Sequence, residues 1–314
     1  MRVGIDIGGT KTHAVVLDER GAVLDQWRGA TGFGADAVVT AAVTAVTVLA
    51  ERQHLLPTRF SSIGIGIPGT VDGHLGRVAH AVNLGVESLD LGAVVQSRLG
   101  RPVSVENDVN AAALGAYHLL APTGVRSMAY LNLGTGLAAG IVLGGALWRG
   151  PRGVAGEIGH VVVDPRGPEC PCGQRGCLET LASGSALARL WPQSPDPTVH
   201  RLFAAVDARD PVATTVAERV VENIAAAVRL LVLTVDVDAV VVGGGLSSLG
   251  DRLLDELRER LRRDAARSPF LASLELPTRV LLSPRDAPVA AIGAALVGQR
   301  SRDAVVAEAP AGLP

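Results

Sequence analysis

Aromatic residues are scarce in this sequence, and their scarcity indicates how the interior is built. Only 3% of the 314 residues are Phe, Trp or Tyr, whereas 48% are apolar. Ala, Val, Leu and Gly must therefore fill the core, which suits tightly packed layers of helices and sheets. At roughly 100–200 residues per domain, the length favours two domains or one large domain.

A strong charge of either sign is also missing. The formal net charge is −2, so there is no electrostatic reason to expect a nucleic-acid partner. The opening residues, MRVGIDIGGT, lack the basic segment and long apolar core of a secretory signal. No stretch of about 18 apolar residues runs without a charge or a glycine, so no membrane span is expected. We therefore expect a cytoplasmic protein.

Cysteine is rare, and the three cysteines lie within eight residues of one another. An odd number packed so closely argues against a disulfide framework and for a metal in a reducing compartment. His160, Cys170, Cys172 and Cys177 together offer the four ligands of a closed, tetrahedral zinc site. The alternative is a cluster of small buried cysteines without a metal.

Two acidic residues, Glu157 and Glu179, flank this predicted metal site. Carboxylates beside a rigid site are suited to bind sugar hydroxyl groups, so the cluster and its flanks together indicate a ligand site.

The hydrophobic pattern predicts two similar halves, each opening with a strand, a glycine turn and a second strand. Two such domains would face one another, and the cleft between them is the default ligand site. The tail 301–314, rich in Ala and Pro, is expected to be loose. Strands are expected at 2–7, 13–17, 22–27, 61–69, 102–108, 127–136, 137–150, 238–247 and 278–283, and helices at 35–54, 109–120, 211–234, 251–267 and 288–298.

Three glycine turns follow β-rich runs: DIGGTKT at 6–12, LNLGTG at 131–136 and VVVGGGLS at 240–247. Successive backbone N–H groups in such turns form anion-binding nests. One turn alone is equally well a hairpin, but three after strands favour a phosphate ligand. GIGIPG at 64–69 matches the dinucleotide fingerprint G-x-G-x-x-G, yet Pro68 favours a turn where that fingerprint requires a helix. No P-loop pattern occurs at these turns.

VENDVN at 105–110 places Asp108 where a strand runs into a helix. An Asp there is commonly a helix N-cap, worth about 1 kcal/mol. The other interpretation is a general base that accepts the proton of an attacking hydroxyl.

These motifs resemble the ROK family (repressors, open reading frames and kinases), within the superfamily of actin, sugar kinases and heat-shock ATPases. The resemblance runs from Asp6 to about Gly298. DIGGTKT and LNLGTG look like its two phosphate motifs, VVVGGGLS like its adenosine motif, and GEIGH with CPCGQRGCLE like its zinc and sugar segment. It implies an α/β fold of two actin-like (ribonuclease H-like) domains with an interdomain cleft and a zinc-binding insertion in the larger domain. The expected domains are 1–112 with the C-terminal helix at about 288–300, and 113–287.

The resemblance also implies an ATP-dependent hexose kinase with Mg²⁺ and a structural Zn²⁺. Asp108 would be the catalytic base, and phosphoryl transfer would go to the 6-hydroxyl of glucose. His160 would bind zinc through one ring nitrogen and the sugar through the other. The remaining sugar contacts would be Asn83, Asn107, Asp108, Glu157 and Glu179. Nucleotide and Mg²⁺ contacts would be Asp6, Gly8, Gly9, Thr10, Lys11, Thr12, Gly134, Thr135, Gly136, Gly243, Gly244 and Gly245.

The resemblance leaves alternatives open. An amino sugar (glucosamine, N-acetylglucosamine, N-acetylmannosamine or a 3-amino hexose) is the second substrate candidate, and a non-catalytic sugar sensor is a further reading. Repressors of the family carry an N-terminal helix-turn-helix, and here the first phosphate strand starts at residue 2, so a repressor is not expected. A homodimer or homotetramer is expected.

Two positions depart from the family pattern. Val86 and Glu87 stand where an aromatic residue is common after the NLG segment, so the wall of the sugar pocket differs. Ala138 stands where glycine is commoner after the second phosphate motif.

Overall fold

The computed structural model describes residues 1–120, 124–192, 198–284 and 287–307, with side chains described up to residue 298. The chain divides into two compact units. The first unit comprises Met1–Leu120 and the segment from Asp286 onward, and the second unit comprises Ala121–Arg285. Helix α3 (Asp108–Leu120) is continuous, so the break expected after residue 112 would fall inside a helix, whereas the units divide after it.

The first unit is built on a five-stranded sheet in the order β3-β2-β1-β4-β8. The first three strands are antiparallel, and β4 and β8 run parallel to β1. A smaller antiparallel sheet, β5-β6-β7, follows β4 in the chain. The bounds are β1 Arg2–Ile7, β2 Lys11–Leu17, β3 Val23–Ala30, β4 Ser62–Ile67, β5 Thr70–Asp72, β6 Arg77–Ala81, β7 Val86–Leu89 and β8 Val103–Asn107.

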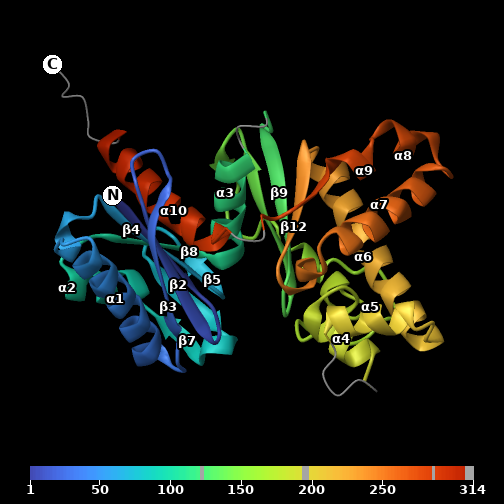
Figure 1. Ribbon diagram of the computed structural model, residues 1–314, viewed down its shortest axis with the longest axis horizontal. Helices are drawn as coiled ribbons and strands as arrows, with labels where there is room; N and C mark the ends of the chain where they lie inside the picture. The colour runs from blue at the N-terminus through green and yellow to red at the C-terminus, as the bar shows by residue number, and fades with distance from the viewer. Residues whose placement is uncertain (121–123, 193–197, 285–286, 308–314) are drawn as a thin grey trace. The chain divides into compact units, whose positions relative to one another are not determined.

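Helices cover both faces of this sheet (Figure 1). Alternate β1 residues Val3, Ile5 and Ile7 are buried in a core shared with α1 (Ala35–Arg52) and α2 (Leu91–Leu99). The opposite face carries α3 and α10 (Val289–Ala307). This alternation is the period-2 pattern of a strand buried on both faces.

Glycines let α10 lie directly on the sheet and on α3. A Cβ added at Gly4 or Gly64 would lie 1.9 Å from the carbonyl oxygen of Ala291 or Ala294. A Cβ at Gly115 would lie 1.8 Å from the carbonyl oxygen of Val289. No side chain fits at such distances, so Gly64 in the GIGIPG run serves helix packing. Strand β5 follows that run, which agrees with rejecting a dinucleotide fingerprint.

The second unit repeats the order and directions of the first sheet, as β11-β10-β9-β12-β13. Strands β9, β10 and β11 are antiparallel, and β12 and β13 run parallel to β9. The bounds are β9 Ser127–Leu133, β10 Leu137–Leu143, β11 Ala146–Leu147, β12 Ala239–Gly243 and β13 Val280–Leu282. Two sheets with one topology confirm the predicted α/β fold class of two ribonuclease H-like halves.

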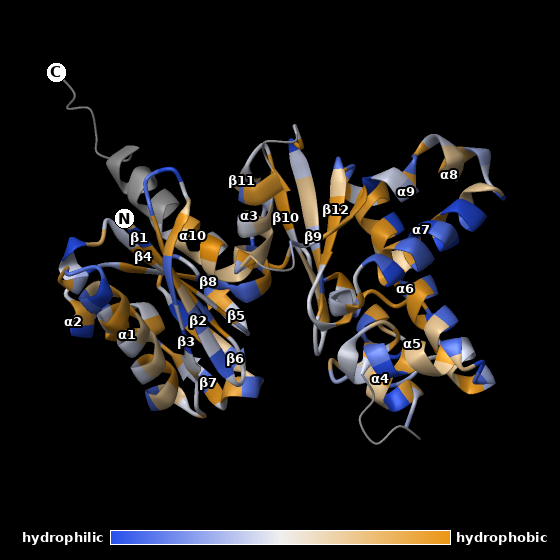
Figure 2. Ribbon diagram, in the orientation of Figure 1, coloured by the Kyte–Doolittle hydropathy of each residue, from blue (hydrophilic) through white to orange (hydrophobic). Residues whose placement is uncertain are grey.

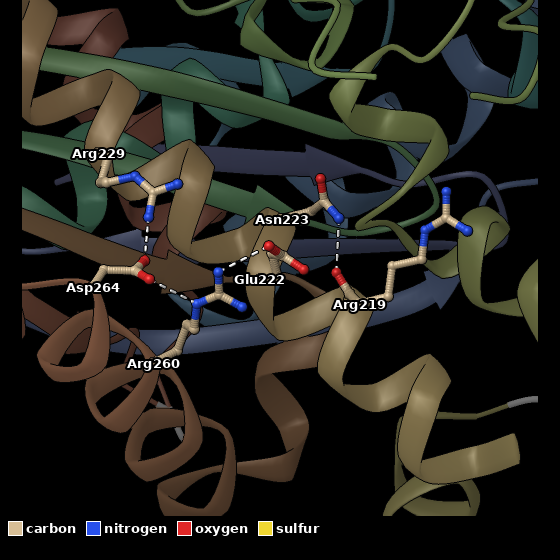
Figure 3. Close-up of polar contacts among 6 residues, drawn as sticks. All are labelled: Arg219, Glu222, Asn223, Arg229, Arg260 and Asp264. Carbon is tan, nitrogen blue, oxygen red and sulfur yellow. Dashed lines mark hydrogen bonds and ion pairs between the residues drawn. The ribbon is translucent and has the colours of Figure 1, made fainter. Parts of the chain in front are cut away.

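Helices α6 (Pro211–Val235) and α7 (Asp251–Ala265) pack on this second sheet. Leu253, Leu257 and Leu261 recur every fourth residue and are buried, while most of the other residues of α7 are charged (Figure 2). An ion-pair chain ties the two helices together (Figure 3): Asp264 of α7 pairs with Arg229 and Arg260, and Arg260 reaches Glu222 of α6 at 2.8 Å. The remaining helices of the unit are α4 Gly184–Leu190, α5 Val199–Asp207, α8 Pro269–Ser273 and α9 Leu276–Arg279.

Short 3₁₀ turns complete the two units: η1 Pro57–Arg59, η2 Val82–Leu84, η4 Ile158–His160, η5 Leu178–Thr180 and η6 Gly245–Leu249. The expected loose tail differs in part, because residues 301–307 belong to α10, and 308–314 lie outside the described residues. Among the described residues, no helix combines the length and apolarity that crossing a bilayer requires.

Candidate active site and metal centre

The first glycine turn joins β1 to β2 and is braced from a neighbouring loop. The N–H of Gly8 donates to the carbonyl of Lys11 at 2.9 Å, which closes the turn. Thr31 donates its hydroxyl to the carbonyl of Gly8 at 2.8 Å and bonds the hydroxyl of Thr12 at 2.9 Å. Thr12 is fully buried, so its side chain supports the turn from inside, while Gly9, Thr10 and Lys11 are exposed. Lys11 is the only lysine of the chain.

Two carboxylates stand at the same end of the first sheet. Asp6 is near the end of β1, and Asp108 follows the end of β8, two strands away and parallel. Burial, and secondly the negative charge of Asp108, raises the pKa of Asp6 from 3.8 to about 7. Such a pair is suited to hold a cation or a proton, because either would relieve the repulsion.

Asn107, rather than Asp108, supplies the longer-range cap of α3. Its Oδ1 accepts from the N–H groups of Val109 at 2.9 Å and Asn110 at 3.3 Å. Oδ1 of Asp108 accepts from the adjacent N–H of Val109 at 2.9 Å. Buried Glu106 accepts from the backbone N–H of Asn107 and from the side chain of Asn110, both at 3.0 Å. These bonds stabilise the junction between β8 and α3. The cap therefore does not require the Asp108 carboxylate.

Asn83 is brought to the same end of the sheet by η2. The side chain of Asn107 donates to the carbonyl of Gly69 at 3.1 Å, and a Cβ at Gly69 would lie 3.1 Å from the N of Ala81. A Cβ at Gly9 would lie 3.5 Å from the Cβ of Asn83. These contacts link Asn107, Asn83 and the first glycine turn into one cluster.

The second and third glycine turns meet in the second unit. Gly244 has φ +83°, and a Cβ there would lie 2.5 Å from the carbonyl carbon of Leu133, just before Gly134. The N–H groups of Gly184 and Ser185 donate to the carbonyls of Gly134 at 2.8 Å and Thr135 at 3.2 Å. The exposed side chain of Thr135 and exposed Gly245 remain on the surface of this paired turn. Ala138 lies beyond the turn, in β10, where it pairs with Asn132.

His160, Cys170, Cys172 and Cys177 converge as the sequence predicts, with ligand atoms all within 4.8 Å of one another. The Nδ1 of His160 lies 3.8 Å from the Sγ of Cys170, and Cys172 and Cys177 are 3.7 Å apart at sulfur. Hydrogen bonds from the backbone and side chain of Gln174 lower the pKa of Cys172 to about 6, whereas burial raises that of Cys177 to about 12. The donor set and its spacing fit a tetrahedral metal.

The two flanking glutamates lie on short turns around β10. Oε2 of Glu179 accepts from the N–H of Leu137 at 3.0 Å, directly after the second glycine turn. Glu157 is exposed and directly precedes η4, which ends at His160. Gly156 holds this segment against the sheet, since a Cβ there would lie 1.7 Å from the carbonyl oxygen of Ala139. Glu179 and the segment that leads to His160 thus both contact strand β10.

Three supporting residues were not predicted from the sequence. Thr31 braces the first turn, Glu106 holds the α3 junction, and Gln174 donates to the carbonyl of His160 at 3.0 Å and to the Sγ of Cys172 at 3.5 Å. Gln174 lies inside the CPCGQRGC run, so its position within the motif could have indicated its contact with the cluster. Glu106 likewise lies inside the VENDVN run, whereas Thr31 carries no such signal, because its partners Gly8 and Thr12 are about 20 residues away in the chain.

Comparisons with known proteins agree with this geometry. The glucokinase of Streptomyces coelicolor is 36% identical over 282 residues, 84% of this chain and 87% of that protein. The N-acetylmannosamine kinase of Pasteurella multocida is 32% identical over 78% of this chain and 81% of its own.

Solved structures are similar over almost the entire chain. The ROK hexokinase from Thermus thermophilus has a TM-score of 0.83 at 34% identity, over 96% of this chain and 99% of its own. The ROK family glucokinase from Streptomyces griseus, in complex with glucose and AMPPNP, has a TM-score of 0.77 at 34% identity, over 95% and 99%. Residues 2–300 match the ROK family as a whole, and this protein belongs to that family.

Proposed function

We propose that this protein is an ATP-dependent hexose kinase that transfers the γ-phosphoryl group of ATP to the 6-hydroxyl of glucose. The glucokinases of the family are among its most similar relatives. The Streptomyces griseus structure holds glucose together with AMPPNP, an analogue of ATP. These relatives support a hexose and a nucleoside triphosphate as the two substrates.

The observation that carries the proposal is the carboxylate pair of Asp6 and Asp108 beside the first glycine turn. Asp108 opens α3 at the end of β8, beside the first glycine turn, and its carboxylate would orient a sugar hydroxyl and accept its proton. Phosphoryl transfer needs little covalent help from the protein. Positioning of the hydroxyl and neutralisation of phosphate charge therefore dominate the rate.

The glycine turns would hold the nucleotide. The exposed turn Gly8–Lys11 offers backbone N–H groups and one ammonium to phosphate oxygens, and Gly134–Gly136 offers a second set. Gly243–Gly245 would lie at the adenosine. Thr12, being buried, would act only through the turn that it supports.

The carboxylate pair also fits a magnesium ion. The raised pKa of Asp6 reflects burial and the nearby charge of Asp108, and a divalent cation would relieve that cost. Mg²⁺ commonly binds through one or two carboxylates plus substrate phosphates. When bound, it would neutralise charge on the phosphates. Asp6 would hold it near the first turn.

The Cys3His cluster would hold a structural zinc. Four protein donors leave no open position, so the ion would brace the fold. Since Nδ1 of His160 faces the cysteine sulfurs, Nε2 would be left to hydrogen-bond the sugar. Glu157 and Glu179 would bind further hydroxyls, with Asn83 and Asn107 completing the sugar contacts.

An amino sugar is the second substrate candidate. The relative from Pasteurella multocida is an N-acetylmannosamine kinase, only slightly less similar than the glucokinases. N-acetylmannosamine differs from glucose at the 2-position of the ring, where an axial acetamido group replaces an equatorial hydroxyl.

A coupled ADP-release assay with ATP and Mg²⁺ tests the function. The sugars are glucose, mannose, fructose, glucosamine, N-acetylglucosamine and N-acetylmannosamine. We expect the highest kcat/KM with glucose. If kcat/KM is highest with an amino sugar, that amino sugar replaces glucose as the proposed substrate. No sugar-dependent ADP with any member of the panel would support the sensor reading and contradict the kinase.

A further inference from the structure

The two most exposed large apolar side chains in the described part of the chain lie on two loops of the first unit that are hydrogen-bonded to each other. Phe33 is 76% exposed and Val82 is 80% exposed. Phe33 belongs to the loop between β3 and α1, and Val82 opens η2. The N–H of Gly34 donates to the carbonyl of Leu84 at 2.7 Å, which ties the two loops to each other.

The Phe33 ring rests on glycine. A Cβ added at Gly85 would lie 2.3 Å from Cε1 and 2.4 Å from Cζ of Phe33, so the ring lies against the bare α-carbon of Gly85. Gly85 has φ +65°, a conformation that disfavours other residues there. The backbone thus supports one side of the ring, and most of its surface faces solvent.

These two loops adjoin the proposed sugar contacts. Asn83 lies between Val82 and Gly85 in sequence and beside Gly9 in space. Thr31, two residues before Phe33, bonds the carbonyl of Gly8. The loops that present Phe33 and Val82 are therefore the same loops that fix Asn83 and the first glycine turn.

The positions directly after the NLG segment, Val86 and Glu87, carry no aromatic side chain. Val86 stands after the NLG segment, begins β7 and is only 3% exposed, inside the core of the first unit. Its neighbour Glu87 is exposed and charged. Phe33 is thus the aromatic side chain displayed near Asn83 within the described part of this unit, because Trp27 of β3 is packed against the core.

We propose that Phe33, with Val82, forms the apolar wall of the hexose site and contributes to sugar specificity; this inference rests on the proposed kinase function. A pyranose with equatorial hydroxyls presents C–H groups on its faces and polar groups at its edge. An aromatic ring packs on such a face while Asn83 and its polar neighbours bind the edge. An axial hydroxyl would meet the ring and be left without a partner, so the wall favours glucose over mannose.

The test compares Phe33→Ala with Phe270→Ala, since Phe270 is also exposed (61%) but lies on α8 of the second unit. KM for glucose should rise about five- to tenfold in Phe33→Ala, the size of one aromatic contact. The kcat and the KM for ATP should stay within about twofold of wild type. The preference for glucose over mannose should narrow, and Phe33→Trp should restore the glucose KM. Phe270→Ala should change none of these.

Several results would overturn the proposal. If the wild-type protein turns over glucose and Phe33→Ala leaves the glucose KM unchanged, the role of Phe33 is contradicted but the kinase function is not. The same KM rise in Phe270→Ala, or equal rises in the glucose and ATP KM of Phe33→Ala, points to a general loss of structure and also contradicts it. No sugar-dependent ADP release from the wild-type protein overturns the kinase and the wall together.

Discussion

The two five-stranded sheets share one strand order and one set of directions, yet equivalent strand positions before their glycine turns differ in charge. Asp6 stands two residues before the first glycine of the turn after β1, and Asn132 stands two residues before Gly134 in the turn after β9. The first position is a carboxylate of raised pKa, and the second is a neutral amide. One backbone frame thus carries a carboxylate at this strand position in one unit and an amide in the other, where the carboxylate at the turn is that of Glu179, from η5.

Glycine also serves different purposes in the two units. In the first unit, Gly4, Gly64 and Gly115 clear space for a helix on the sheet. In the second unit, Gly156 and Gly244 let loops close on β10 and on the end of β9. The two units thus carry different groups at equivalent turns, and substitutions can test whether the proposed base of the first unit acts separately from the proposed nucleotide and metal sites of the second.

The largest effect is expected at Asp108. Asp108→Asn should keep sugar affinity and lower kcat at least ~10²-fold, the scale of a lost general base. Steady-state kinetics give kcat, and a separate sugar-binding measurement gives the sugar affinity. Asn107→Ala is the matched comparison, since it removes the cap and a sugar contact but not the base. Near wild-type turnover in Asp108→Asn would exclude it as the base.

Loss of zinc should affect the sugar more than the nucleotide. Cys172→Ser replaces an exposed ligand of the cluster and should release the metal. We expect the sugar KM to rise about tenfold through misplacement of His160, the order seen when ligand orientation is lost, with the ATP KM within about twofold. Metal content and both KM values are the measurements. Equal losses for the two substrates would mean that the metal only holds the second unit together.

A carboxylate at position 132 should remove the difference between the equivalent strand positions of the two sheets. Asn132→Asp puts a carboxylate beside Gly134 and Gly244, where phosphates would approach. The ATP KM should rise about tenfold, ~1.4 kcal/mol, and the sugar KM should not change. Asn132→Ala removes the amide without adding charge, so it should raise the ATP KM less than Asn132→Asp does. If the two variants behave alike, charge at this turn is not the deciding property.

The smallest effect concerns the stability of the first unit and its pH dependence. The folded-state pKa of Asp6 is about 7, above the ordinary 3.8, so the folded protein binds more protons between these values. Stability is therefore lost as pH rises through this window, and the cost is complete above about pH 7. Asp6→Asn should melt several degrees higher than wild type at pH 8 and no higher near pH 4.

Mg²⁺ should narrow that difference at pH 8, because a cation favours ionised Asp6. Asp36→Asn, at an exposed carboxylate in the first turn of α1, controls for the loss of one negative charge. Thermal melts across pH 4–8 supply the data. A difference between Asp6→Asn and wild type that does not grow with pH would contradict the raised pKa.

Local patterns predicted the central elements well and missed what depends on distant partners. Buried runs such as RVGIDI and AVVVG lie between turn residues, and the four metal ligands lie close in sequence, so both were recognisable. The small β5-β6-β7 sheet was missed, because RVAHA mixes charge with apolar residues and His80 has a positive φ. The contact of Phe33 with Gly85 joins loops far apart in the chain, which no local pattern encodes.

Helix α10 has a consequence for how the chain is made. It packs on β1, β4 and α3, yet it is synthesised only after every residue of the second unit. A chain elongating at about 5–20 residues per second leaves the glycine-lined face of the first sheet uncovered for several seconds or more. The second unit, continuous in sequence, can finish folding in that interval. The first half of the protein to be translated is therefore the last to be completed.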